Sequence, residues 1–74
     1  GLVGSEMCIR DRASAAITDD DGTVRVSGAE ILSRIVRESV DQPIGEQART
    51  LLLPLQQDRD HRVVAAALNG LQLR

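Results

Sequence analysis

Acidic side chains are the most concentrated candidates for chemistry in this sequence. Three consecutive aspartates, Asp19, Asp20 and Asp21, invite a calcium site, and if Asp19 is position one of an EF-hand-like loop, Glu30 is position twelve. Position six would then be Val24, where that loop requires glycine for its sharp turn. We therefore interpret the three aspartates as an acidic loop before a helix and expect no metal.

A second group of ionisable residues surrounds His61, the only histidine. A metal site would need a further His or Cys nearby, and a nucleophilic site would need a serine at a recognisable spacing. Asp58 and Asp60 could form an acid–base pair, but a turn and a helix cap already give both a structural role. The glycines fit no phosphate-binding loop. We expect no catalytic residue, no cofactor and no enzymatic activity.

Composition limits the fold and the partners. The chain has 74 residues, so it forms at most one small domain. Because it has no Phe, Tyr or Trp, its core must be built from Leu, Ile, Val and Ala. The net charge of −2 and the mixed signs argue against a general nucleic-acid or anionic-membrane surface. No apolar run approaches the roughly 18 residues of a membrane span, and one cysteine forms no internal disulfide.

The first twelve residues fit no regular element. Residues 2–11, LVGSEMCIRD, resemble one reading frame of a transposase-type sequencing adapter, and the match includes Met7 and Cys8, the only residues of their types. We therefore expect residues 1–12 to be a non-native, disordered tail and exclude them from the fold. On this interpretation residues 13–74 are a fragment of a longer protein.

The remaining sequence contains an internal repeat with an offset of 39 residues. DDDGTV at residues 19–24 aligns with DRDHRV at residues 58–63, so that each half reads D-x-D-x-x-V. A small residue follows four positions later in both halves, as Gly28 and Ala67, and would let a neighbouring helix approach closely. The repeat predicts two similar loop–helix units.

Three helices are expected, over about residues 22–39, 44–57 and 61–73. Asp21 and Asp60 should cap the first and third of these, because a short carboxylate accepts hydrogen bonds from the free N–H groups of a first helical turn. Apolar residues recur at helical spacing along one side of each helix.

Two prolines and the start of the chain complete this prediction. Pro43 should occupy the first helical position, and Pro54 should bend the second helix or shorten its last turn. Residues 13–17 are interpreted as the end of an earlier helix. The expected core consists of Val24, Leu32, Ile35, Ala48, Leu51, Leu52, Leu55, Val63, Ala67 and Leu71.

One alternative concerns residues 17–27, ITDDDGTVRVS. The Asp-Gly pair and the alternation of Val24 and Val26 are also typical of a β-hairpin. The first arm is short and polar, however, and the apolar stripe continues at helical spacing, so a helix is favoured. Arg25, Arg34 and Arg37 are expected on the solvated face of that helix.

Two segments resemble the HEAT repeat family. LLLPLQQDRDHRVVAAALNGL at residues 51–71 is similar to the family pattern L-x-P-L-x-x-D-x-D-x-x-V-R-x-x-A-x-x-A-L, and TDDDGTVRVSGAEILSRI at residues 18–35 is similar to the second half of a preceding unit. Arg25 matches the family arginine, which often forms an Asp–Arg ladder between neighbouring units. Val64 replaces this arginine in the second unit, so the resemblance does not imply the ladder there. Gly22 and His61 stand where proline is common.

The resemblance implies an all-α fold of antiparallel helix pairs in an α-solenoid, with about three helices and an N-terminal stub. It implies a scaffold for protein–protein interaction, stacked on neighbouring repeats of its full-length chain. Two alternatives stay open: an accessory segment of a larger enzyme, for example one like bilin lyases, and a nucleic-acid-binding helical repeat, which the acidic balance disfavours.

Overall fold

The computed structural model describes residues 12–72, and this part of the chain is helical with no strands. The all-α prediction is therefore confirmed, and the hairpin alternative over residues 17–27 is excluded because a helix begins at Gly22. The expected adapter-derived tail, apart from Arg12, lies outside the described residues. No helix in residues 12–72 is long and apolar enough to cross a membrane.

Helix α2 comprises Gly22–Glu38. It begins where the Asp21 carboxylate accepts a hydrogen bond from the Thr23 backbone N–H at 2.9 Å. Before it, residues 12–16 form a short helical segment. The two elements approach closely because Gly28 has no side chain: a Cβ there would lie 2.8 Å from the Ala16 Cβ. The small residue at this position thus permits the helix contact that the repeat predicted.

Helix α3 comprises Pro43–Leu52 and continues as the 3-10 helix η1, Leu53–Gln57. Pro43 occupies the start of α3, where its missing N–H leaves no hydrogen bond unmade. Pro54 cannot donate to a preceding carbonyl, and the α-helix gives way to the tighter helix just before it. The loop before α3 turns through Asp41, which has a φ of 68°.

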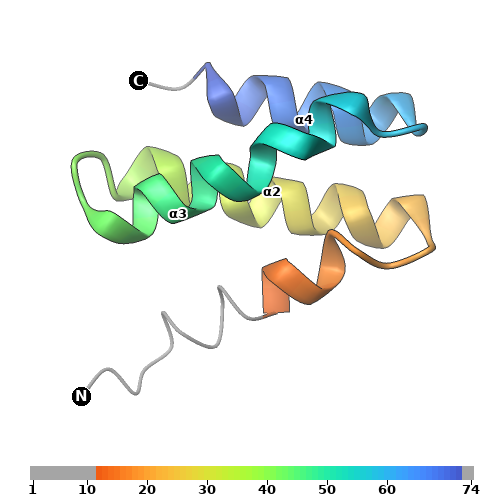
Figure 1. The fold of residues 1–74 in the computed structure, drawn as a ribbon, viewed down its shortest axis with the longest axis horizontal. Helices are drawn as coiled ribbons and strands as arrows, with labels where there is room; N and C mark the ends of the chain where they lie inside the picture. The colour runs from red at the N-terminus through yellow and green to blue at the C-terminus, as the bar shows by residue number, and fades with distance from the viewer. Residues whose placement is uncertain (1–11, 73–74) are drawn as a thin grey trace.

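Helix α4 comprises His61–Leu71, within the range of about 61–73 expected for the third helix; residue 73 lies outside the described residues. Its N-cap is Asp60, whose carboxylate accepts a hydrogen bond from the Arg62 backbone N–H at 2.9 Å. Helices α2 and α4 run side by side in the same direction, and α3 with η1 returns between them in the opposite direction (Figure 1). Both aspartate-rich loops consequently lie at the same end of the molecule.

The hydrophobic core of the described residues is built from aliphatic side chains. Among the expected core residues, Leu32, Ala48, Leu52, Val63 and Ala67 have no exposed surface, and Ile35 and Leu55 are also buried. Residues Ala13, Ile17, Ala29 and Val36 join them.

Three expected core positions are less enclosed. Leu51 and Leu71 are half-buried and pack against the core from its edge. Val24 is also half-buried, so its placement in the closed core was wrong. The buried position next to it is Arg25, which is only 7% exposed and was expected in solvent.

Candidate functional site

The two repeated loops have the same internal geometry. In the first, the Asp19 carboxylate accepts a hydrogen bond from the Asp21 backbone N–H at 2.8 Å, and in the second Asp58 does the same for Asp60 at 2.8 Å. The second aspartate of each loop then caps the following helix. These contacts give the aspartates defined structural roles. Within residues 12–72, no cluster of three or more His, Cys, Asp or Glu side chains could hold a metal ion.

Arg25 joins the two loops. Its Nε lies 2.9 Å from one Asp58 carboxylate oxygen and its Nη2 lies 3.1 Å from the other, a bidentate arrangement. Its Nη1 donates to the backbone carbonyls of Asp19 and Asp20 at 2.8 and 2.9 Å. The side chains of Arg25 and Asp58 are only 9% and 10% exposed. One guanidinium therefore binds its own loop and the loop of the next unit.

Hydrogen bonds shift the pKa values of both aspartates in the second loop. Burial raises the pKa of Asp58, but the Asp60 N–H and the Arg25 guanidinium together outweigh it, and the net pKa is lowered. Side-chain and backbone hydrogen bonds from Arg62 lower the pKa of Asp60 to about 2. The same pair raises the pKa of Arg62. Both carboxylates are thus held in their charged form.

His61 and the acid–base candidates Asp58 and Asp60 lie at the start of α4 and in the loop before it. His61 is exposed at the first position of α4. Asp58 is engaged by Arg25, and Asp60 forms an ion pair with Arg62 at 2.8 Å.

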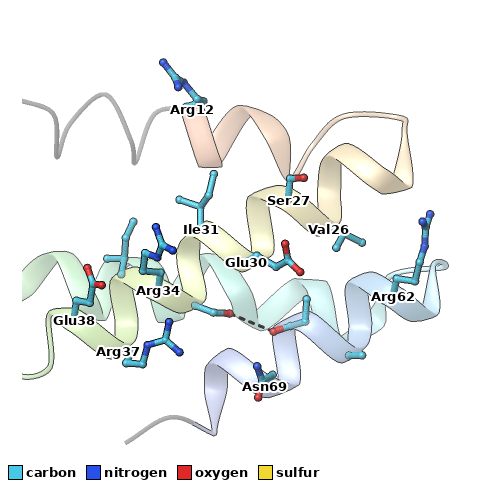
Figure 2. Close-up of a pocket in the computed structure, with 14 residues that line it drawn as sticks. Arg12, Val26, Ser27, Glu30, Ile31, Arg34, Arg37, Glu38, Arg62 and Asn69 are labelled. Carbon is cyan, nitrogen blue, oxygen red and sulfur yellow. Dashed lines mark hydrogen bonds between the residues drawn. The ribbon is translucent and has the colours of Figure 1, made fainter.

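A groove of about 1150 Å³ lies along α2 and α4 on the side where their side chains meet (Figure 2). Its floor contains half-buried Ala66 from α4 and buried Ser33 from α2, and the Ser33 hydroxyl donates to the Ala66 carbonyl at 3.3 Å. Both helices contribute to the lining, which comprises Arg12, Val26, Ser27, Glu30, Ile31, Ser33, Arg34, Ile35, Arg37, Glu38, Arg62, Ala65, Ala66 and Asn69.

Charged groups border an apolar strip of the groove, which consists of Val26, Ile31, Ile35, Ala65 and Ala66. Arg34 and Arg37 are exposed, and neither guanidinium forms an ion pair or hydrogen bond with another side chain in residues 12–72. Glu38 lies beside them at one end, and Arg62 is at the other end with its charge matched by Asp60 (Figure 2). The site is therefore a mixed apolar and charged surface with two guanidiniums available to a partner.

The sequence did not predict this groove, because its lining comes from two helices whose relative placement was unknown. It also placed Arg25 on the solvated face. The family resemblance contained the relevant signal, because it implies that the arginine at position 25 pairs with an aspartate of a neighbouring unit.

Comparisons with known protein-family models, curated proteins and solved structures find no match for this chain. The family resemblance therefore stays a prediction from the quoted residues.

Proposed function

We propose that this chain is part of a HEAT-like helical scaffold that binds a protein partner along the groove between α2 and α4. The observation that supports this proposal is the pair Arg34 and Arg37, two unmatched guanidiniums beside an apolar strip. Such a surface suits a peptide segment that carries a carboxylate next to an apolar side chain.

Nucleic acid fits this groove less well. Glu30 and Glu38 alternate with the arginines along the same helix, and carboxylates would repel a phosphate backbone. A peptide can match both signs at once, because its own side chains can carry either charge.

The proposal is tested by peptide display against the whole chain. Peptides selected on the wild type should be enriched in sequences that combine Asp or Glu with Leu, Ile or Val. They should lose at least about tenfold in affinity when Arg34 and Arg37 are both changed to Glu, because a repelled carboxylate replaces a charge-assisted hydrogen bond.

The control is Arg59→Glu at an exposed arginine outside the groove, and its charge change matches that of Arg34→Glu or Arg37→Glu made singly. It should leave the affinity of the selected peptides within about twofold of the wild type. Failure to select any peptide, or equal losses in the Arg59 variant and the groove variant, would refute binding at this site.

A further inference from the structure

The internal repeat lets each buried residue of α2 be compared with its counterpart on α4. Residues Ala29 and Leu32 of α2 are completely buried, and Ser33 is 8% exposed, because α3 and α4 cover this side of α2. The counterparts 39 positions later are Leu68, Leu71 and Gln72 on α4. Leu68 is 40% exposed, Leu71 is half-buried and Gln72 is exposed.

On the opposite side of the two helices, the residues of α4 are more buried than their counterparts on α2. On α4, Val63 is completely buried and Gly70 is buried, and a side chain at Gly70 would meet the Ser33 side chain of α2. Their counterparts on α2 are Val24 and Ile31, and both are half-buried. Ser27, the counterpart of half-buried Ala66, is exposed.

The described chain thus has two exposed faces, each of which a further unit of the same repeat would cover. The outer face of α4 consists of Val64, Leu68 and Leu71, and the free face of α2 consists of Val24, Ser27 and Ile31. Within the molecule, the equivalent faces of α2 and α4 already pack together. The packing of α2 on α4 inside the chain therefore shows how the two uncovered faces could pack on each other.

We infer that copies of this chain associate head to tail, with the outer face of α4 in one copy packed on the free face of α2 in the next. Because the two faces are different, the contact is heterologous, and each added copy leaves one of each face uncovered. The assembly should consequently grow beyond a dimer as concentration rises. The contact does not require a partner in the groove, but Ser27 and Ile31 belong to both surfaces, so the next copy would cover one edge of the groove.

One residue makes this contact weaker than its internal counterpart. Inside the chain, Arg25 binds the Asp58 carboxylate of the next unit. The counterpart of Arg25 is Val64, and the counterpart of Asp58 is Asp19, which has no ion-pair partner within residues 12–72. In the head-to-tail contact Val64 therefore faces a carboxylate that it cannot bind.

This difference provides a gain-of-association experiment on the full chain. Sedimentation velocity over a range of concentrations should show a sedimentation coefficient that rises continuously for the wild type. Val64→Arg should tighten the association by about tenfold, because it supplies the charge-assisted pair with Asp19 of the next copy. Adding Asp19→Asn should remove the gain, since the amide keeps the turn hydrogen bond but has no charge.

Leu68→Glu tests the apolar part of the contact and should weaken association at least tenfold. Val40→Glu is the matched control, because Val40 is 52% exposed in the loop after α2 and belongs to neither face. It should associate like the wild type. Circular dichroism verifies that each variant stays helical, and Val64→Arg, on a half-buried surface position, provides a second measurement if Leu68→Glu unfolds.

Four outcomes would overturn the inference. A wild type that is monomeric at all concentrations has no such contact, and a closed dimer has a different symmetry. If Val64→Arg weakens association, or if its gain survives Asp19→Asn, the faces do not meet in the proposed register.

Discussion

Arg25 and Asp58 are 33 positions apart, yet they form a bidentate ion pair with distances of 2.9 and 3.1 Å, and both side chains are about nine-tenths buried. The same guanidinium also donates to the carbonyls of Asp19 and Asp20. One buried side chain thus binds three acceptor groups from two loops.

Removal of this guanidinium should destabilise the fold strongly. Arg25→Met keeps most of the aliphatic stem but leaves the Asp58 carboxylate buried without its cation, so the free energy of unfolding should fall by about 3–5 kcal/mol. Urea denaturation measures this change. Arg34→Met, an exposed arginine on the same helix, is the control and should stay within about 0.5 kcal/mol of the wild type. Equal effects of the two substitutions would contradict the bridging role of Arg25.

Acid should destabilise the protein through the second loop. The pKa of Asp60 falls from 3.8 to about 2 on folding, and the pKa of Asp58 is also lowered. Because protonation then favours the unfolded state, this stabilisation is present above about pH 3.8 and is lost as the pH falls toward about 2. Asp60→Asn keeps a good N-cap without the charge, so its unfolding free energy should depend less steeply on pH in this window. Identical slopes for variant and wild type would refute the assignment.

The helices and loops of this fold could be predicted largely from local sequence. Asp21 and Asp60 identify two helix starts because capping involves residues only two positions apart. Pro43 and Pro54 mark the start and the early end of α3 for an equally local reason, since proline lacks an N–H.

Long-range contacts could not be predicted in the same way. Helical spacing places Arg25 on the same side of α2 as buried Ala29 and Leu32, but it does not identify the partner that the arginine binds there. Its burial depends on Asp58 in a different loop, which the packing of α4 beside α2 brings near. Val24 was misplaced for the related reason that the first unit has no neighbour on that side within the described chain.

The core should be sensitive at its central position. Leu52 of α3 has no exposed surface. Its side chain lies next to Gly70 of α4, where an added Cβ would be 2.8 Å from the Leu52 Cδ1. Leu52→Ala should therefore lower the free energy of unfolding by about 2–5 kcal/mol, through lost apolar burial and the cavity left behind. The neighbouring Leu53→Ala is a matched control, because Leu53 is 51% exposed, and should cost less than about 1 kcal/mol. Thermal and urea melts that rank Leu53→Ala as the more harmful change would contradict the core assignment.

Glycine at position 28 should be required despite its low helix propensity. In an open helix interior, Gly→Ala usually stabilises by about 1 kcal/mol. Here a Cβ would lie 2.8 Å from the Ala16 Cβ and 2.9 Å from the Ile17 Cγ2, so the segment before α2 must move away. Gly28→Ala should therefore lower the melting temperature, whereas Ser27→Ala at the adjacent exposed position should not. A higher melting temperature for Gly28→Ala would show that this contact is not tight.

The boundary of the folded unit can be located by two truncations. Ala13 is completely buried, and its carbonyl accepts a hydrogen bond from the Ile17 N–H at 3.0 Å, whereas Arg12 is exposed. An N-acetylated chain that starts at Ala13 should therefore keep the urea midpoint of the full chain, as the adapter interpretation of residues 1–12 also predicts. A chain that starts at Gly22 loses Ala13, Ile17 and the Asp21 cap, and it should unfold at a clearly lower urea concentration. A large loss of stability already in the Ala13 chain would mean that residues 1–12 contribute to the fold, and the adapter interpretation would then be wrong.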